Sequence, residues 1–119
     1  LLAQTLSKSV GYYFTLFSPF IGALGAFIAG SNTVSNILFA SFQLETALTL
    51  GIPIVIILSL QTVGGAIGNM IAIHNILAAS ATVHLHHKEG EIIKKTIWVC
   101  LLYAIIAAIT AFLILALNY

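Results

Sequence analysis

Gln61-Thr-Val-Gly-Gly-Ala-Ile-Gly-Asn69 is a glycine-rich interruption in the middle of a long apolar run. The run covers residues 46–87, which are 42 positions without Asp, Glu, Lys or Arg. A helix that crosses the hydrocarbon core of a membrane needs only about 20 such residues, and each glycine weakens a helix by about 1 kcal/mol. Residues 46–83 are therefore predicted to form one transmembrane helix that is broken near the middle of the membrane.

Two further uncharged runs flank this one, 36 residues at 9–44 and 24 residues at 96–119. Only 6% of the 119 residues are charged, whereas about one quarter are charged in a soluble domain. The mean hydropathy is +1.13. This composition excludes a soluble globular domain, a disordered chain and a nucleic-acid binder, which would need a basic face. The chain is predicted to be an all-α integral membrane protein.

A second interruption, Gly30-Ser-Asn-Thr-Val-Ser-Asn36, is polar. It separates two apolar segments, 18–29 and 34–42, each about half as long as a membrane-spanning helix. We predict a re-entrant helical hairpin over residues 18–45, with its polar tip inside the membrane. Such a tip is tolerated only where it is buried in protein or lines a cavity. In the alternative, residues 12–30 cross the membrane and the polar patch forms an external loop.

The remaining segments set the expected topology. Residues 84–95 are hydrophilic and hold three of the four basic side chains, so the positive-inside rule places them in the cytoplasm. Residues 96–117 form the last transmembrane helix, which puts the C-terminus outside. Residues 1–17 are assigned to the end of a preceding helix or to a scaffold segment. Because the chain begins with Leu1 and not with Met, we expect it to be a fragment of a longer protein.

The polar tip is the first candidate binding site. It offers hydroxyl and carboxamide groups from Ser31, Asn32, Thr33, Ser35 and Asn36. At the N-terminus of a half-length helix, free backbone N–H groups and a partial positive charge favour an anion such as a carboxylate. The carboxamides can donate to a carboxylate and accept from a hydroxyl. In the alternative, these side chains only cap the hairpin helices or join neighbouring helices.

The helix break is the second candidate site. It offers Gln61, Thr62, Gly64, Gly65 and Asn69. Unwound backbone carbonyls and side-chain amides can hold a polar substrate or a coupling ion, and two interrupted helices are typical of the midplane site of a secondary transporter. In the alternative, Gly64 and Gly68 form a small-xxx-small pair for close helix packing.

His74 is a candidate for proton coupling, because an imidazole exchanges a proton near neutral pH and this one has apolar neighbours. A histidine that only bonds a neighbouring helix is the alternative. His84, His86 and His87 fit no standard zinc spacing and are interpreted as part of a solvated loop. No nucleophile motif or phosphate loop is present, so we expect no catalytic residue, no metal and no cofactor.

These motifs resemble the C-terminal part of the L-lactate permease family. The matching runs are Ser18-Pro-Phe-Ile-Gly-Ala-Leu-Gly-Ala-Phe-Ile-Ala-Gly-Ser-Asn-Thr-Val-Ser-Asn36, Gln61-Thr-Val-Gly-Gly-Ala-Ile-Gly-Asn-Met70, Ile73-His-Asn-Ile76, Ser80-Ala-Thr82 and Lys88-Glu-Gly-Glu-Ile-Ile93. The resemblance covers about residues 10–100. It implies symport of lactate, and often glycolate, with protons across the bacterial inner membrane. It also implies that the chain is half of an inverted-repeat transporter.

The family looks similar to a wider group of ion transporters whose Ser-Asn-Thr motifs lie at hairpin tips. On that basis Ser31, Asn32 and Thr33 carry over as contacts to a carboxylate or an ion, and residues 61–69 carry over as the facing wall of the site. The partners that follow are lactate or glycolate, protons, the lipid bilayer and the N-terminal part of the same transporter. An oligomer is possible and a nucleic-acid partner is not expected.

Two alternatives to lactate transport remain at this point. One is a transporter of another organic anion, such as a dicarboxylate or gluconate. The chain contains no Arg to clamp a second carboxylate, which favours a monoacid. The other is a structural membrane module without transport activity, in which the glycine and Ser/Asn residues serve helix packing alone.

Overall fold

The computed structural model describes residues 2–85 and 87–118, with side chains from residue 10 onward, and the described residues form five helices. They are α1 (Leu2–Ala29), α2 (Asn32–Leu50), α3 (Ile54–Gly68), α4 (Ile73–Thr82) and α5 (Glu89–Asn118). Val10–Ala29 and Glu89–Asn118 are long and apolar enough to cross a membrane, and α3 with α4 makes a third, bent candidate. The predicted all-α membrane fold is confirmed.

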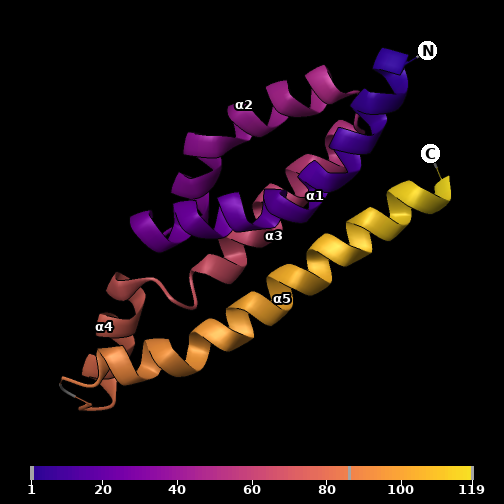
Figure 1. Ribbon diagram of the computed structural model, residues 1–119. Coiled ribbons are helices and arrows are strands. Elements are labelled where there is room, and N and C mark those ends of the chain that lie inside the picture. The colour runs from indigo at the N-terminus through magenta and orange to yellow at the C-terminus, as the bar shows by residue number, and fades with distance from the viewer. Residues whose placement is uncertain (1, 86, 119) are drawn as a thin grey trace.

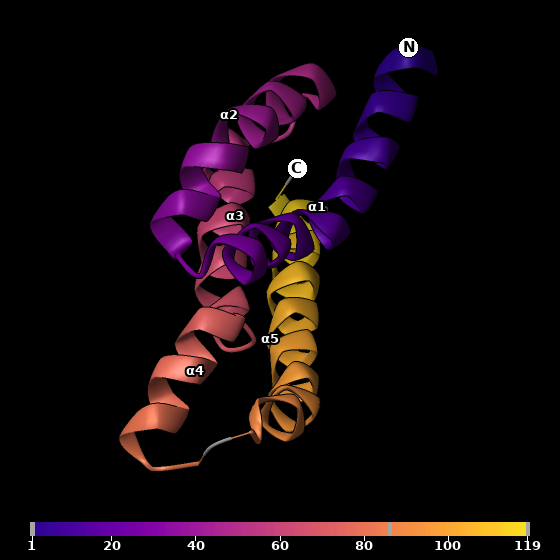
Figure 2. The ribbon, with the colours of Figure 1, turned by 90° about the vertical axis from the view of Figure 1, so that its left-hand side faces the viewer.

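The helices run roughly along one direction, so the molecule has two ends (Figure 1). The turn between α1 and α2 lies between these ends. The beginning of α1, the α2–α3 connection and the end of α5 lie at one end, and the α4–α5 connection lies at the other. Figure 2 shows the turn between α1 and α2 between these two ends as well. The most extensive helix contact is between α1 and α3, and α2 packs on both.

Residues 30 and 31 form the turn of the α1–α2 hairpin. Gly30 has a φ of 68°, a left-handed conformation that costs glycine little. Ser31 is the N-cap of α2, and its hydroxyl accepts a hydrogen bond from the Val34 amide at 3.3 Å. The capping role that was the alternative for this serine is therefore present. Whether the hairpin re-enters or crosses a bilayer stays a prediction.

The first arm of the hairpin is longer than the sequence indicated. No helix begins at Ser18, because α1 continues from Leu2 through Pro19 to Ala29. Proline removes one backbone N–H and bends a helix, and Figure 2 shows α1 bent in its middle. Ser18 and Pro19 are fully buried against the neighbouring helices, so packing holds the helix together across the proline.

The second arm is also longer, since α2 ends at Leu50 and Gly51 closes it with a φ of 66°. The broken helix therefore begins at Ile54, directly after Pro53, and residues 46–50 belong to α2. Helices α3 and α4 are bent by 41° relative to each other. The break lies at residues 69–72, so Gly64 and Gly65 are inside α3 and not at the break.

Helix α5 starts earlier than predicted and includes residues 89–95 of the expected loop. Glu89 and Glu91 lie in its first turn, where negative charge is favoured by the helix dipole. Its buried side is a stripe of mostly small residues, Cys100, Ala104, Ala108, Ala111 and Leu115. The other side exposes large apolar side chains, including Trp98 at 72%, as expected of a surface that faces lipid or further protein.

Candidate functional site: the hairpin tip and the helix break

Small residues bring the backbones of α1 and α3 into direct contact. A Cβ added at Gly64 would overlap the carbonyl of Pro19, and one added at Gly68 would overlap the carbonyl of Ala23. From the other side, a Cβ at Gly22 would overlap the carbonyl oxygen of Gln61. The glycines thus serve close helix packing, as the small-xxx-small alternative predicted.

Buried glutamines connect the hairpin to α3 through hydrogen bonds. The Ser18 hydroxyl donates to Gln43 Oε1 at 2.9 Å, and Gln43 Nε2 donates back to the Ser18 carbonyl at 3.0 Å. Gln43 Nε2 also donates to Gln61 Oε1 at 2.9 Å. Both glutamines are at most 1% exposed. We call Ser18, Ser35, Gln43 and Gln61 the polar ladder.

The ladder continues from α3 back to α2 and α1. Gln61 Nε2 donates to Ser35 Oγ at 3.1 Å and to Asn36 Oδ1 at 3.3 Å. The Ser35 hydroxyl donates to the Gly22 carbonyl at 2.7 Å. Every polar atom of the two glutamines therefore has an internal partner. Because these groups bond one another, Gln61 and Ser35 join helices within this chain and have no unpaired polar atom.

Gln43 was missed by the analysis of the sequence. It lies in the apolar second arm of the hairpin, where a carboxamide in hydrocarbon must find a partner on another helix. The position of this carboxamide within an apolar segment was the signal that the sequence offered. Nothing in the sequence indicates that its partners are Ser18 and Gln61.

The hairpin tip and the α3–α4 break meet in space. Asn75 Nδ2 donates to the Gly30 carbonyl at 3.3 Å, and to the backbone and side-chain oxygens of Asn69, both at 3.4 Å. A Cβ built on Gly30 would lie 3.1 Å from Nδ1 of His74. We call the place where residues 30–32 meet residues 69–75 the tip–break junction.

Asn32, at the hairpin tip, has a side-chain oxygen that forms no hydrogen bond within the described part of the chain. Its Oδ1 is buried and has no hydrogen-bond partner among the described residues. The same oxygen lies against Gly65, where an added Cβ would overlap it. A buried carbonyl oxygen without a donor is uncommon and needs an explanation. A hydrogen-bond donor from outside the described residues would satisfy it.

The helix ends give the junction its electrostatic character. Helix α2 begins at Asn32 and α4 begins at Ile73, so two helix N-termini lie at the junction. The first turn of each helix leaves N–H groups without intrahelical acceptors and carries a partial positive charge. Helix α4 has no side-chain cap, whereas Ser31 caps α2 and already accepts from the Val34 N–H. Two such ends form an arrangement that suits a carboxylate.

The other predicted site residues are not part of the junction. Thr33 is exposed in the first turn of α2, and Asn36 bonds Gln61 in the ladder. Thr62 is exposed on the side of α3 that carries Val55 and Ser59, and its hydroxyl donates to the Leu58 carbonyl. The described residues contain no group of three His, Cys, Asp or Glu that could hold a metal ion, and His86 lies outside them.

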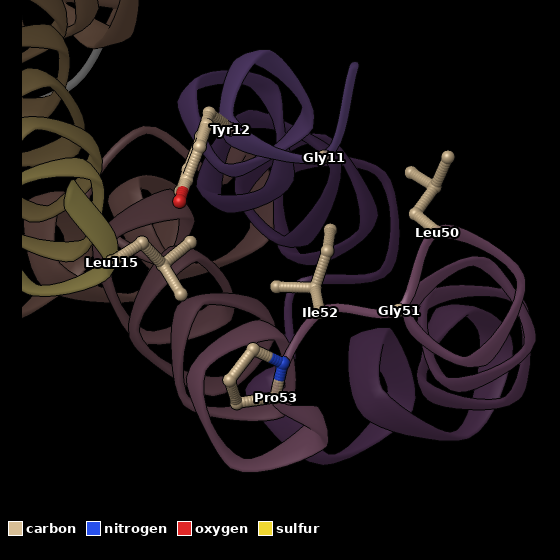
Figure 3. A pocket seen from close by; sticks show the side chains of 7 residues that line it. All are labelled: Gly11, Tyr12, Leu50, Gly51, Ile52, Pro53 and Leu115. Atoms are coloured by element: carbon tan, nitrogen blue, oxygen red, sulfur yellow. The ribbon is translucent and has the colours of Figure 1, made fainter. Parts of the chain in front are cut away.

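A separate small pocket lies where α2 turns into α3 (Figure 3). It is lined by Gly11, Tyr12, Leu50, Gly51, Ile52, Pro53 and Leu115. In Figure 3 the Tyr12 hydroxyl points toward Leu115, and the Tyr12 ring meets Phe112 edge-on at 6.0 Å between centroids. Apart from the Tyr12 hydroxyl, the lining side chains carry no polar group, so this pocket offers a carboxylate no charged or carboxamide partner.

Comparison with known proteins identifies one family. The profile of the L-lactate permease family matches residues 1–118. A putative L-lactate permease of Haemophilus influenzae is 48% identical over 119 residues, which are 100% of this chain and 22% of that protein. The L-lactate permease of Escherichia coli is 37% identical over 91% of this chain and 20% of its own length.

A protein named for a different acid is similar as well. The glycolate permease GlcA of Escherichia coli is 36% identical over 87% of this chain and 18% of its own length. The chain thus spans about a fifth of the length of the curated relatives it matches. No solved structure is significantly similar to it.

Proposed function

The chain belongs to the L-lactate permease family, and on that premise we propose that it forms part of the transport core of a permease for lactate and glycolate. The names of the relatives, L-lactate permease and glycolate permease, support this substrate class and support a transporter over an enzyme. Both acids are small 2-hydroxy monocarboxylates. A site for them needs an anion-binding element and a hydrogen-bond partner for the hydroxyl.

The proposed substrate site is the tip–break junction, and the unpartnered Asn32 Oδ1 is the observation that carries this proposal. The carboxylate accepts from N–H groups at the first turns of α2 and α4. The 2-hydroxyl donates to Asn32 Oδ1, which satisfies the buried oxygen. The rest of the longer transporter supplies the facing half of the site, as in transporters built from inverted repeats.

The proposed topology follows from the position of the tip. The tip lies between the two ends of the helices in both views (Figures 1 and 2), which supports a re-entrant hairpin that enters and leaves from one side. The α4–α5 connection is cytoplasmic, because Lys88 lies in it and Lys94 and Lys95 lie near it at the beginning of α5. The end of α5 is then outside the bacterial inner membrane.

Asn32→Ala is expected to lower the initial rate of labelled lactate uptake by the full-length transporter severalfold, up to about tenfold. The lost hydrogen bond joins the 2-hydroxyl to Asn32 Oδ1, two uncharged groups. Such a bond is worth about 0.5–1.5 kcal/mol, and each 1.4 kcal/mol is a factor of ten. The matched control is Asn118→Ala, because Asn118 is exposed at the end of α5 and only bonds the Ile114 carbonyl. Uptake by Asn32→Ala at the wild-type rate, with equal membrane levels, would remove Asn32 from the site.

We propose that His74 moves the coupled proton. It is exposed beside Gly30, so its imidazole can exchange a proton with water or with a group from the rest of the transporter. His74→Gln is expected to abolish the alkalinisation of the medium that accompanies lactate uptake. His87→Gln is the control, because His87 is exposed in the α4–α5 connection. Unchanged proton movement in His74→Gln would exclude this role.

A further inference from the structure

A groove lies between α4 and α5, on the side of the break that leads to the α4–α5 connection. It is bordered by the break at Asn69 and Met70, by one side of α4 and by Ile92 of α5. The two helices contact each other and are joined at the end of the molecule shown at the bottom of Figure 2. The groove offers about 440 Å³ of space, while one water takes about 30 Å³ in the liquid. A small organic acid and several waters fit within it.

Ser80 places an unsatisfied hydroxyl at this groove. The residue is 3% exposed, and its Oγ has no hydrogen-bond partner among the described residues. A buried hydroxyl without a partner costs free energy. It lies on α4 in the same lining as Asn69, Asn75 and Thr82, so four polar side chains border the groove.

Asn75 belongs both to the tip–break junction and to the groove. Its Nδ2 bonds the Gly30 carbonyl of the hairpin tip, and its side chain also borders the groove. The groove is therefore continuous with the tip–break junction through Asn69, Met70 and Asn75. At its other end it reaches Thr82 and Val83, directly before the α4–α5 connection.

The lining suits a small amphipathic anion that must not be held tightly. The polar groups are hydroxyls and carboxamides, and Ile76, Ala79 and Ile92 provide apolar surface for a methyl group. None of the described residues that line the groove is charged. Uncharged donors bind a carboxylate weakly, and a transport pathway needs sites that substrate can both enter and leave.

We propose that this groove is a second binding position for the substrate, a short 2-hydroxy acid, between the tip–break junction and the α4–α5 connection. The inference rests on the proposed function. The Ser80 hydroxyl donates to the carboxylate, and when the acid is lactate its methyl group packs against Ile76 and Ile92. The substrate then passes between the junction and this position past Asn75.

The first experiment places a cysteine at Ser80 in the full-length transporter, with Cys100 and every other cysteine replaced by alanine. Inside-out membrane vesicles are treated with a membrane-impermeant methanethiosulfonate. Ser80→Cys is expected to react, and saturating lactate is expected to slow the reaction severalfold, whereas sulfate at equal ionic strength leaves it unchanged. Ala78→Cys is the matched control, because Ala78 lies on the same helix and does not line the groove.

The outcomes separate this inference from the proposed function. An unreactive Ser80→Cys in a transporter that still takes up lactate means that other protein or lipid fills the groove, and overturns the inference. Reaction without protection by lactate means a water-filled crevice that binds no substrate, and overturns it too. Failure of the unmodified transporter to take up lactate contradicts the proposed function instead. If Ser80→Cys fails to reach the membrane, Thr82→Cys gives the same readout from the same lining.

The second experiment measures KM. Ser80→Ala removes the donor and is expected to raise the KM for lactate about tenfold, while kcat stays near the wild-type value. Thr110→Val is the control, because it removes a hydroxyl that only bonds the Ile106 carbonyl on an exposed side of α5. An unchanged KM in Ser80→Ala would contradict the second binding position.

Discussion

Gly64→Leu is expected to prevent the transporter from folding. Even a Cβ at this position would overlap the carbonyl of Pro19, and the nearest atoms are backbone, which cannot rotate away as a side chain can. Helices α1 and α3 would have to separate along their most extensive contact. Overpacking usually costs about 1–3 kcal/mol, but here the displacement also breaks the polar ladder. Since folded proteins are stable by only about 5–15 kcal/mol, we expect little folded Gly64→Leu protein.

The measurement is size-exclusion chromatography of the detergent-extracted, fluorescently tagged full-length protein. The wild type is expected to elute as one symmetric peak and Gly64→Leu as aggregate. Gly90→Leu is the matched control, because a Cβ at Gly90 meets no atom within 4 Å and leucine is the better helix former by about 1 kcal/mol. A folded Gly64→Leu protein with the thermal stability of the wild type would show that α1 and α3 do not pack as described.

Gln43→Ala and Gln61→Ala are each expected to destabilise the transporter by about 2–4 kcal/mol. Each truncation leaves buried partners without hydrogen bonds, at about 1–3 kcal/mol for every orphaned group. In Gln61→Ala the orphaned groups are one N–H of Gln43 and an oxygen of Asn36. The double variant is expected to lose less than the sum of the two, with a coupling energy of about 0.5–3 kcal/mol.

Thermal unfolding of the purified full-length protein measures these differences. The matched control is Ser59→Ala, which removes an exposed hydroxyl from α3, the helix that carries Gln61. The same variants separate a structural role from a substrate contact. If Gln61 only joins helices, the folded fraction of Gln61→Ala keeps the wild-type KM for lactate. Additive destabilisation in the double variant would show that the two glutamines do not interact.

Much of the fold could be predicted from the sequence because a bilayer strictly limits which segments can cross it. A spanning segment needs about 20 apolar residues, and irregular backbone at membrane depth must be accommodated by protein or a cavity. The uncharged runs therefore predicted the membrane class, and the polar patch at residues 30–36 predicted a turn. These signals are local, so they can be read without knowing which helices are neighbours.

The exact residues at which helices end or break could not be predicted, because they depend on contacts between helices. Pro19 is a local signal for the end of a helix, yet α1 continues through it where Ser18 and Pro19 are buried. Gly64 and Gly65 weaken an isolated helix, yet they lie inside α3 because Gly64 fits against α1. In both places tertiary packing outweighs local propensity.

For the candidate site, the sequence by itself determined which polar side chains are available within the apolar runs. Only the tertiary structure decided how they are divided between packing and binding. Gln61 and Ser35 are used in the polar ladder with Gln43, while Asn32 keeps an unpaired oxygen at the tip–break junction. The physical reason is that a hydrogen bond needs two partners within about 3 Å. In the polar ladder the partners lie 13 to 26 residues apart along the chain, and at the junction Asn75 lies 45 residues from Gly30.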